Sequence, residues 1–255
     1  MKPLVVANWK MNTSLSDAIV LTQYLKNNFE DSQSEVVLCP PFVWLYPMQE
    51  ILEKRAKNIH LGAQNIFYEE KGAYTGEVSP VMIKSLANYV IVGHCERKKY
   101  LHESFLEVAK KVKVAVKNDL RVILCIGENK KTNLTKPNFD QIFDQMNEIL
   151  RSINKKEMEN IILVYEPVWA ISTNVGGEPA SGIYANMVVE KMREKITRKY
   201  GSEIAHHTRI LYGGSVNASN AQEFLHQKEI NGVLVGASSL KAREFIKICN
   251  IAASK

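Results

Sequence analysis

Short runs of apolar residues recur along the chain and are separated by longer, more polar stretches. Each run is apolar at successive positions and rich in Val, Ile and Leu, a pattern typical of parallel strands that are buried on both faces. We therefore predict eight strands, at Leu4–Asn8, Glu35–Cys39, Ile59–Ala63, Tyr89–Val92, Arg121–Ile126, Ile161–Tyr165, Arg209–Tyr212 and Gly232–Val235.

Between these runs, apolar residues follow the three- to four-residue spacing of an amphipathic helix. The clearest helical segments are Ser16–Phe29, Glu103–Val116, Phe139–Ile153 and Tyr184–Tyr200. Weaker helical patterns cover residues 43–56, 79–87, 217–227 and 240–250.

Eight strands that are each followed by a helix predict an α/β fold, a (β/α)8 TIM barrel formed by residues 1–255 as a single domain. A doubly wound open sheet is the alternative. The number of strands favours the barrel. The first turn, Asn8–Asn12, favours it too, because it lacks a GxGxxG phosphate-binding sequence.

The composition is that of a folded protein, with 45% hydrophobic and 24% charged residues. The apolar run Leu4–Ala7 is too short for a signal peptide, and no run approaches the ~20 apolar residues that cross a bilayer. Four widely spaced cysteines suit free thiols in a reducing compartment: Cys39, Cys95, Cys125 and Cys249. We expect a cytoplasmic protein without a membrane partner.

The formal net charge is +6, but the basic residues form short pairs rather than long runs. A solvated basic surface is the simplest interpretation, and such a surface also concentrates small anionic substrates. Because no arginine-rich tract or interleaving of aromatic and basic residues is present, we expect no nucleic-acid partner.

The active site of a (β/α)8 barrel forms at the C-terminal ends of its strands. Glu166 follows the apolar strand Ile161–Tyr165, where a carboxylate loses hydration and becomes a stronger base near neutral pH. His94 lies before the start of a helix, whose N-terminus disfavours an imidazolium and favours a neutral ring that donates a hydrogen bond. Lys10, after the first strand, could bind an anionic substrate.

Each of these three residues also has a simpler interpretation. Glu166 could be a structural glutamate that pairs with a cation, His94 a histidine in a surface loop, and Lys10 a solvated lysine. Position in the sequence alone leaves these alternatives open.

Glycine-containing turns follow the last two strands, at Gly213-Gly214-Ser215 and Gly236-Ala237-Ser238. Backbone N–H groups at such turns, backed by a short helix, commonly bind phosphate in this fold, although plain turn chemistry is the alternative. No histidines have the spacing of a metal site, so we predict none. A base, a neutral electrophile, a cation and a phosphate site together suit proton abstraction next to a carbonyl.

Seven motifs in this order make the chain resemble the triosephosphate isomerases along nearly its whole length. The motifs are NWKMN at Asn8–Asn12, AQN at Ala63–Asn65, GAYTGE at Gly72–Glu77, VGHCER at Val92–Arg97, CIGE at Cys125–Glu128, YEPVWA at Tyr165–Ala170 and YGGSV at Tyr212–Val216.

The resemblance implies that Glu166 removes a proton from the carbon beside the carbonyl of dihydroxyacetone phosphate, while neutral His94 polarises that carbonyl. Lys10 and Asn8 would contact the substrate and stabilise the enediolate. Return of the proton to the adjacent carbon gives D-glyceraldehyde 3-phosphate, and no cofactor is needed. The pairing of a carboxylate base with a neutral histidine is the known chemistry of that family.

The resemblance also implies a lid at Pro167–Gly177 that closes over the phosphate and excludes water. Trp169 would form its N-terminal hinge. Tyr212 and Ser215 would contact the closed lid, and Glu128 the open lid.

The same resemblance assigns phosphate binding to Ser172 in the lid and to Ser215, Gly236 and Ala237 in the last two turns. Segment 65–79 resembles the loop that inserts into a second subunit, so a homodimer is implied. Thr75 on this loop would reach the partner's Asn8 and the partner's Glu96.

The chain departs from the family pattern at a few positions. Ser172 and Asn174 stand where the lid usually carries glycine, and Gly176-Gly177 makes the second hinge permissive. Ala237 replaces a usual glycine, and Cys95 replaces a usual serine, which is a better hydrogen-bond donor. We expect a working lid with altered opening kinetics.

These departures keep two alternative functions open. One is an isomerase of a four-carbon ketose phosphate (a tetrulose phosphate), which would use the same base and phosphate site. The other is a catalytically inactive barrel that acts as a binding protein.

Overall fold

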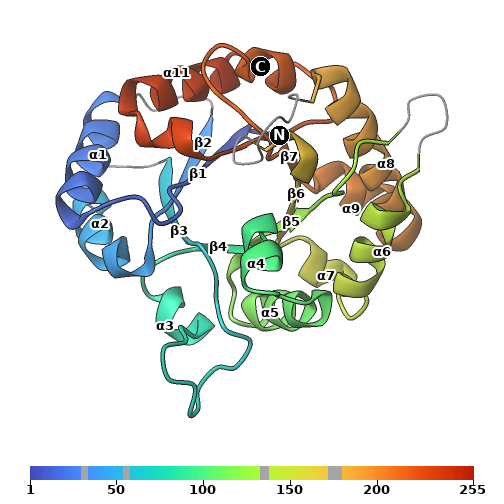
Figure 1. The fold of residues 1–255 in the computed structure, drawn as a ribbon, viewed down its shortest axis with the longest axis horizontal. Helices are drawn as coiled ribbons and strands as arrows, with labels where there is room; N and C mark the ends of the chain where they lie inside the picture. The colour runs from blue at the N-terminus through green and yellow to red at the C-terminus, as the bar shows by residue number, and fades with distance from the viewer. Residues whose placement is uncertain (30–33, 54–57, 133–137, 172–179) are drawn as a thin grey trace.

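The computed structural model describes residues 1–29, 34–53, 58–132, 138–171 and 180–255. In this part of the chain, eight parallel strands form a closed barrel in the order β1 to β8 (Figure 1). The strands are β1 (Leu4–Asn8), β2 (Glu35–Cys39), β3 (Ile59–Ala63), β4 (Tyr89–Val92), β5 (Arg121–Ile126), β6 (Ile161–Tyr165), β7 (Ile210–Tyr212) and β8 (Gly232–Val235).

The pairing of β1 shows how the sheet closes. It pairs in parallel with β2 on one side and with β8 on the other, so that Leu4 lies between Glu35 and Gly232. This closure confirms the predicted (β/α)8 barrel and excludes the doubly wound open sheet.

Alternate residues of each strand face opposite sides of the sheet. Leu4 and Val6 of β1 belong to the cluster that fills the barrel interior, with Val37, Ile91, Ile123 and Leu211 among its other members. Val5 and Ala7 belong to the larger cluster between the sheet and the helices. Both faces of the strands are therefore apolar, which explains the continuous apolar runs in the sequence.

Helices surround the barrel on its outside (Figure 1). They are α1 (Leu15–Asn28), α2 (Leu45–Leu52), α3 (Pro80–Lys84), α4 (Cys95–Tyr100), α5 (Phe105–Lys117), α6 (Asp140–Ile149), α7 (Lys155–Met158), α8 (Gly182–Tyr200), α9 (Ser202–His207), α10 (Ala221–Leu225) and α11 (Ala242–Ala253). The described residues also form short 3-10 helices at η1 (Phe42–Trp44), η2 (Val168–Ala170) and η3 (Ala237–Leu240).

Capping residues define where two of the main helices begin. Ser14 caps α1 and Ser104 caps α5, each accepting a hydrogen bond from the backbone N–H three residues later. The carboxylates of Asp17 and Glu107 accept from the cap N–H in return, which completes a capping box. The helix predicted from Glu103 therefore begins two residues later.

Some predicted helices are shorter in the structure. α6 ends at Ile149 rather than Ile153, and only Ala221–Leu225 of residues 217–227 is α-helical. His206 and His207 lie outside every segment predicted as a helix, and a polar loop was therefore expected there, but both belong to α9. Gly201, with a φ of 97°, separates α9 from α8 and allows a second helix to start at once.

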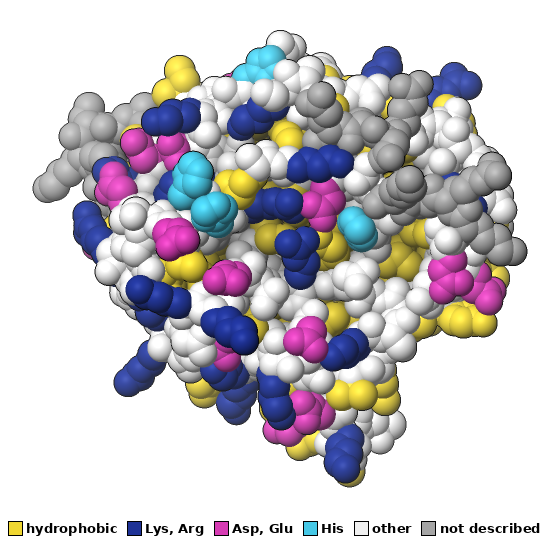
Figure 2. All heavy atoms as spheres, turned by 180° about the vertical axis from the view of Figure 1, so that it is seen from behind, with side chains coloured by type: hydrophobic (Ala, Val, Ile, Leu, Met, Phe, Trp, Pro, Cys, Tyr) yellow, Lys and Arg dark blue, Asp and Glu magenta, His cyan; other side chains and the backbone are white. Residues whose placement is uncertain are grey.

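The end of the barrel that faces away from the viewer in Figure 1 is rich in charged side chains. Figure 2 shows Lys and Arg side chains there interspersed with Asp and Glu. The excess positive charge is thus spread among acidic neighbours on this face, as expected of a solvated surface.

Candidate active site

Glu166 directly follows β6 and is 1% exposed. Its backbone N–H donates to the carbonyl of Ile126 at 2.8 Å, which continues the pairing of β6 with β5. Glycine lies on both sides of it: a Cβ on Gly127 would lie 1.7 Å from the Glu166 carbonyl oxygen, and one on Gly213 would lie 3.0 Å from its Cγ. Gly127 therefore lets the backbone of Glu166 approach closely, and Gly213 leaves room for its buried side chain.

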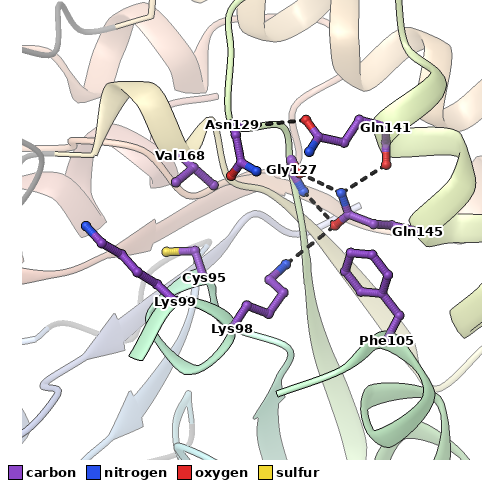
Figure 3. Close-up of a pocket in the computed structure, with 9 residues that line it drawn as sticks. All are labelled: Cys95, Lys98, Lys99, Phe105, Gly127, Asn129, Gln141, Gln145 and Val168. Carbon is purple, nitrogen blue, oxygen red and sulfur yellow. Dashed lines mark hydrogen bonds between the residues drawn. The ribbon is translucent and has the colours of Figure 1, made fainter. Parts of the chain in front are cut away.

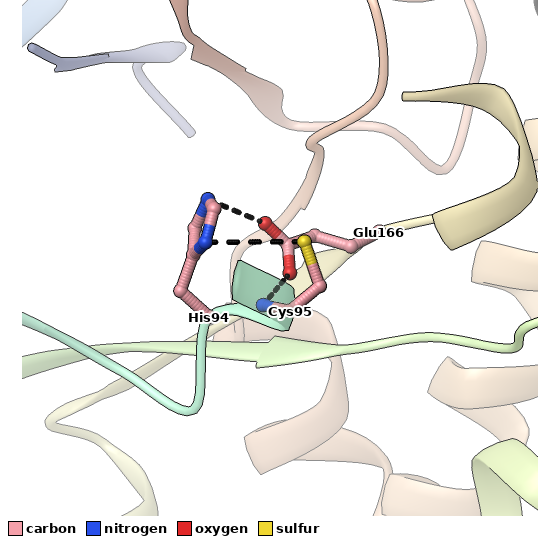
Figure 4. A group of neighbouring side chains, drawn as sticks. All are labelled: His94, Cys95 and Glu166. Carbon is pink, nitrogen blue, oxygen red and sulfur yellow. Dashed lines mark hydrogen bonds and ion pairs between the residues drawn. The ribbon is translucent and has the colours of Figure 1, made fainter. Parts of the chain in front are cut away.

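The carboxylate of Glu166 is held on one oxygen only. Oε2 accepts a hydrogen bond from the backbone N–H of Cys95 at 3.0 Å. Oε1 lies 3.2 Å from Nε2 of His94 (Figure 4), but the two groups are not aligned as a hydrogen bond, and Oε1 is buried without a donor among the described residues. One oxygen of the pair thus remains available to accept a proton.

His94 is the N-cap of α4, as its position before a helix predicted. Its Nδ1 accepts a hydrogen bond from the backbone N–H of Glu96 at 3.2 Å. A neutral imidazole whose Nδ1 accepts must carry its proton on Nε2. The ring therefore presents an N–H donor on the side where Glu166 lies, 72 residues further along the chain.

Lys10 adopts a backbone φ of 53° directly after β1. Its N–H donates to Oδ1 of Asn8 at 3.1 Å, and its carbonyl accepts from Nε2 of Gln64 at 2.9 Å. Its ammonium lies 2.6 Å from Oε1 of Glu96. The strand ends of β1, β3 and β4 thus jointly position one cation.

A cavity of ≈ 400 Å³ lies next to these groups. Lys10, His94 and the turns after β7 and β8 line it, and both predicted phosphate turns contribute: Gly213, Gly214, Ser215, Gly236, Ala237 and Ser238. Ser215 donates from Oγ to the carbonyl of Ala170 at 3.0 Å, which ties the β7 turn to the start of the predicted lid. Ser172, assigned to phosphate binding, and Asn174 and Gly176-Gly177 of the lid lie outside the described residues.

Glu128 organises the base of the predicted lid. Its Oε1 accepts from Tyr165 Oη at 2.7 Å, Trp169 Nε1 at 2.8 Å and Tyr184 Oη at 3.4 Å. Burial raises the pKa of the Glu128 carboxyl, and these hydrogen bonds oppose that rise. Tyr212, which the family resemblance places against the closed lid, stacks on Phe224 with ring centroids 3.9 Å apart.

Cys95 borders a second cavity, of ≈ 300 Å³, between α4 and α6 (Figure 3). Lys98 reaches Gln145 in this cavity, and Gln145 exchanges hydrogen bonds with the backbone of Gly127. Burial, and after it the charge of Glu166, raises the pKa of the Cys95 thiol well above its usual range. The thiol is therefore protonated near neutral pH, 3.8 Å from Nδ1 of His94.

Thr75 is exposed and lies away from the groups above, on the segment 64–79 that projects from the barrel (Figure 1). Large exposed apolar side chains follow each of the first four strands: Met11, Val43, Tyr46, Tyr74, Met82, Tyr100 and Leu101. Met11 is 94% exposed. Such residues on neighbouring loops mark a surface suited to contact another protein.

Sequence reasoning assigned no role to several residues that support the site. Tyr184, read only as part of a helix, bonds Glu128, and Gln145 on α6 bonds Gly127. Lys131 places its ammonium 5.3 Å from the ring centre of Trp169. Their partners lie in other elements, so no local pattern could have revealed these contacts.

Comparisons with known proteins agree with this geometry. Residues 3–252 match the family model described as Triosephosphate isomerase. Proteins named triosephosphate isomerase from Dehalococcoides mccartyi and Alkaliphilus oremlandii are each 43% identical to this chain, over 99% and 98% of it and over 98% and 99% of their own lengths. A protein of the same name from Caldanaerobacter subterraneus is 40% identical over 98% of this chain and 99% of its own.

Proposed function

We propose that this chain, which belongs to the triosephosphate isomerase family, interconverts dihydroxyacetone phosphate and D-glyceraldehyde 3-phosphate in glycolysis and gluconeogenesis. It would act as an intramolecular aldose–ketose isomerase. The observation that carries the proposal is the buried Oε1 of Glu166, which has no donor among the described residues and lies 3.2 Å from Nε2 of His94.

Glu166 acts as the base in this proposal. Its Oε1 takes the proton from the hydroxymethyl carbon of dihydroxyacetone phosphate, and the electron pair of that C–H bond moves to form the enediolate. The proton of the neighbouring hydroxyl passes to the oxygen of the former carbonyl, and the same carboxyl returns its proton to the former carbonyl carbon, which leaves the aldehyde on the adjacent carbon. The reaction conserves all atoms and electrons, so these residues carry it without an added cofactor.

The groups around the base stabilise the enediolate. Nε2–H of His94 donates to the oxygen on which charge develops, and a fixed donor of this kind acts without reorganisation. The ammonium of Lys10 adds positive charge. The side-chain oxygen of Asn8 holds Lys10 by accepting a hydrogen bond from the Lys10 backbone N–H. The turns at Ser215, Gly236 and Ala237, with Ser172 from the lid, bind the phosphate. Their lining of one cavity with Lys10 supports this assignment except for Ser172.

The test is an isomerase assay of the purified protein and its Glu166→Gln variant with glyceraldehyde 3-phosphate. Because general-base catalysis contributes about 10²–10⁴-fold, kcat should fall by about that factor. Glu159→Gln, an exposed glutamate at the end of α7, is the matched control and should keep full activity. Retained activity in Glu166→Gln would exclude Glu166 as the base.

The same assay with a tetrulose phosphate separates the alternative functions. We expect turnover of the triose phosphate to exceed that of the tetrulose phosphate, since the three relatives described above are named triosephosphate isomerase. Preference for the four-carbon substrate would favour the alternative isomerase, and turnover of neither would favour an inactive barrel.

We further propose that the chain forms a homodimer through the loops that follow β1 to β4. The exposed apolar residues of these loops support it, since a monomer would leave them in water. Thr75 on the projecting segment would complete the partner's site near the partner's Asn8 and the partner's Glu96. Thr75→Arg should sediment as a monomer with reduced kcat/KM, whereas Thr197→Arg on the exposed face of α8 should remain dimeric.

We also infer that the chain is one catalytic domain that works in the cytoplasm. Pairing of β1 with β8 joins the two ends of the sequence in one sheet, which supports a single domain. The four cysteines are free, which fits a reducing compartment. Among the residues described, no helix combines the length and apolarity needed to cross a membrane. Cell fractionation against glycolytic and membrane markers tests the location.

A further inference from the structure

His94, Cys95 and Glu166 bring three different metal-ligand atoms together in a buried place. A ring nitrogen of His94, Sγ of Cys95 and a carboxylate oxygen of Glu166 all lie within 4.8 Å of one another (Figure 4). The three residues are 6%, 7% and 1% exposed. The sequence predicted no metal site because His94 and Glu166 are far apart in the chain and only the fold joins them.

We propose that these three side chains form a binding site for a thiophilic divalent cation such as Zn²⁺, and that the bound cation inhibits the enzyme. The inhibition rests on the proposed function, because the cation would occupy both the base and the electrophile. Binding of the cation does not depend on that function. It follows from the donor set alone.

The donor set is one that zinc accepts. Zinc binds nitrogen, sulfur and oxygen ligands at about 2.0–2.3 Å in tetrahedral sites, which places neighbouring ligand atoms roughly 3.5 Å apart. One ligand atom from each residue lies within 4.8 Å of the other two, and Nε2 of His94 lies 3.2 Å from Oε1 of Glu166. Side-chain rotations that shorten the longer separations would therefore bring three ligands around one ion.

The charges also balance. Binding replaces the thiol proton of Cys95 with the metal and releases that proton to solvent, as coordination deprotonates a thiol outright. The resulting thiolate and the carboxylate of Glu166 cancel the two charges of the cation, so a neutral group is buried. The ammonium of Lys10 is already paired with Glu96 at 2.6 Å, and that of Lys98 contacts Gln145 at 3.4 Å.

Groups around the three side chains would allow a metal ion to reach the cluster and would stabilise it once bound. Glu166 Oε1 is a buried acceptor without a donor among the described residues, so the metal would satisfy it. His94 lines the cavity of ≈ 400 Å³ and Cys95 lines that of ≈ 300 Å³, so the cluster can be reached and a fourth ligand can be water. If Nε2 carries the metal, the ring proton moves to Nδ1, which then exchanges the hydrogen bond that it accepts from the Glu96 backbone N–H for one that it donates to Oε2 of Glu96, 3.6 Å away. A carboxylate commonly supports a metal-bound histidine in this way.

Cobalt reports the site directly. Titration of the full-length protein with Co²⁺ should produce visible tetrahedral d–d bands and a thiolate-to-cobalt charge-transfer band, which surface histidines cannot produce. Cys95→Ser should lose the charge-transfer band, whereas Cys249→Ser should keep it, as Cys249 is a buried thiol outside the cluster. Circular dichroism checks that each variant folds, and Glu166→Gln, which removes a second ligand, should also weaken Co²⁺ binding.

Zinc inhibition of the isomerase reaction is the second measurement. Zn²⁺ should inhibit the unmodified protein reversibly, chelator should restore its rate, and high substrate should compete with the metal. Since loss of a supporting group alone costs about 10–100-fold in metal affinity, the inhibitory Zn²⁺ concentration for Cys95→Ser should rise at least about tenfold relative to its own metal-free rate.

If the unmodified protein shows no charge-transfer band, or if the band persists in Cys95→Ser, the proposed site is wrong. Equal zinc sensitivity of Cys95→Ser and the unmodified protein would also overturn it. If the protein turns over neither triose nor tetrulose phosphate, the proposed function fails, but the cobalt spectra still decide the metal site.

Discussion

Lys10 has a φ of 53°, one of three positive values at non-glycine residues in the described part of the chain. A residue with a Cβ pays about 1–2 kcal/mol to adopt this left-handed conformation. Two hydrogen bonds hold it there, from its N–H to Asn8 and from Gln64 to its carbonyl. The strained backbone aims the ammonium at the cavity, so we attribute the strain to function.

The first prediction compares Lys10→Gly with Lys10→Ala. Both variants lose the ammonium and should lose most isomerase activity. Glycine tolerates positive φ, so Lys10→Gly should be more stable than Lys10→Ala by about 1 kcal/mol in urea denaturation. Equal stability of the two variants would show that the conformation at residue 10 is not strained.

The short helix η2 is the element that joins the described part of the site to the predicted lid. Glu128 holds Trp169 by a hydrogen bond, and Trp169 packs edge-on against Tyr184 with ring centroids 5.5 Å apart. Lys131, in the segment after β5, lies 5.3 Å from the ring centre of Trp169 and 5.7 Å from that of Tyr184. Three elements thus hold the start of the lid in one arrangement.

The second prediction is that Lys131→Met loosens this arrangement. An exposed cation–π contact contributes about 0.5–1 kcal/mol, so the lid equilibrium should shift about two- to fivefold. Temperature-jump relaxation monitored by tryptophan fluorescence measures the shift. Lys130→Met, at the exposed neighbouring position, is the control. Identical relaxation of the two variants would show that Lys131 does not influence the lid equilibrium.

The whole barrel is tied together at the end opposite the active site. Glu35 at the start of β2 contacts Arg209 at 2.7 Å and Arg121 at 3.5 Å, and it accepts a hydrogen bond from Tyr89. His60 of β3 lies 3.8 Å from the same carboxylate. One side chain thus connects β2 with β3, β4, β5 and the residue before β7.

Burial raises the pKa of the Glu35 carboxyl, but the hydrogen bond from Tyr89 and the charge of Arg209 outweigh it, so the net pKa is lowered from 4.5. A lowered pKa in the folded state means that the unfolded chain binds more protons in this range. The stabilisation by Glu35 is therefore present above about pH 4.5 and is lost as the pH falls through the folded value.

The third prediction is that Glu35→Gln destabilises the barrel by roughly 3 kcal/mol at pH 7, because it leaves a partly buried arginine without its partner. The difference from the unmodified protein should shrink as the pH falls below about 4.5. Urea denaturation across pH measures both effects. Glu190→Gln, exposed on α8, is the control, and a pH-independent difference would contradict the assigned charge network.

Much of the fold followed from the chain alone. The eight strands were predicted nearly to the residue, because a strand covered on both faces must be apolar at every position. Helix ends were less accurate: the prediction missed α9, because the effect of Gly201 depends on its φ. The resemblance of seven motifs identified the family, and the comparisons confirm it.

The tertiary structure decided which side chains meet. Glu166 reaches His94 and the N–H of Cys95 only because β4 and β6 end at the same edge of a closed barrel. Closure of the barrel also brings Lys10 next to Glu96. It likewise gathers His94, Cys95 and Glu166 in one buried place. Local chain physics determines strands and helices, since their hydrogen bonds and burial repeat along the sequence. The contacts of a site join distant residues, so they exist only once the barrel has closed.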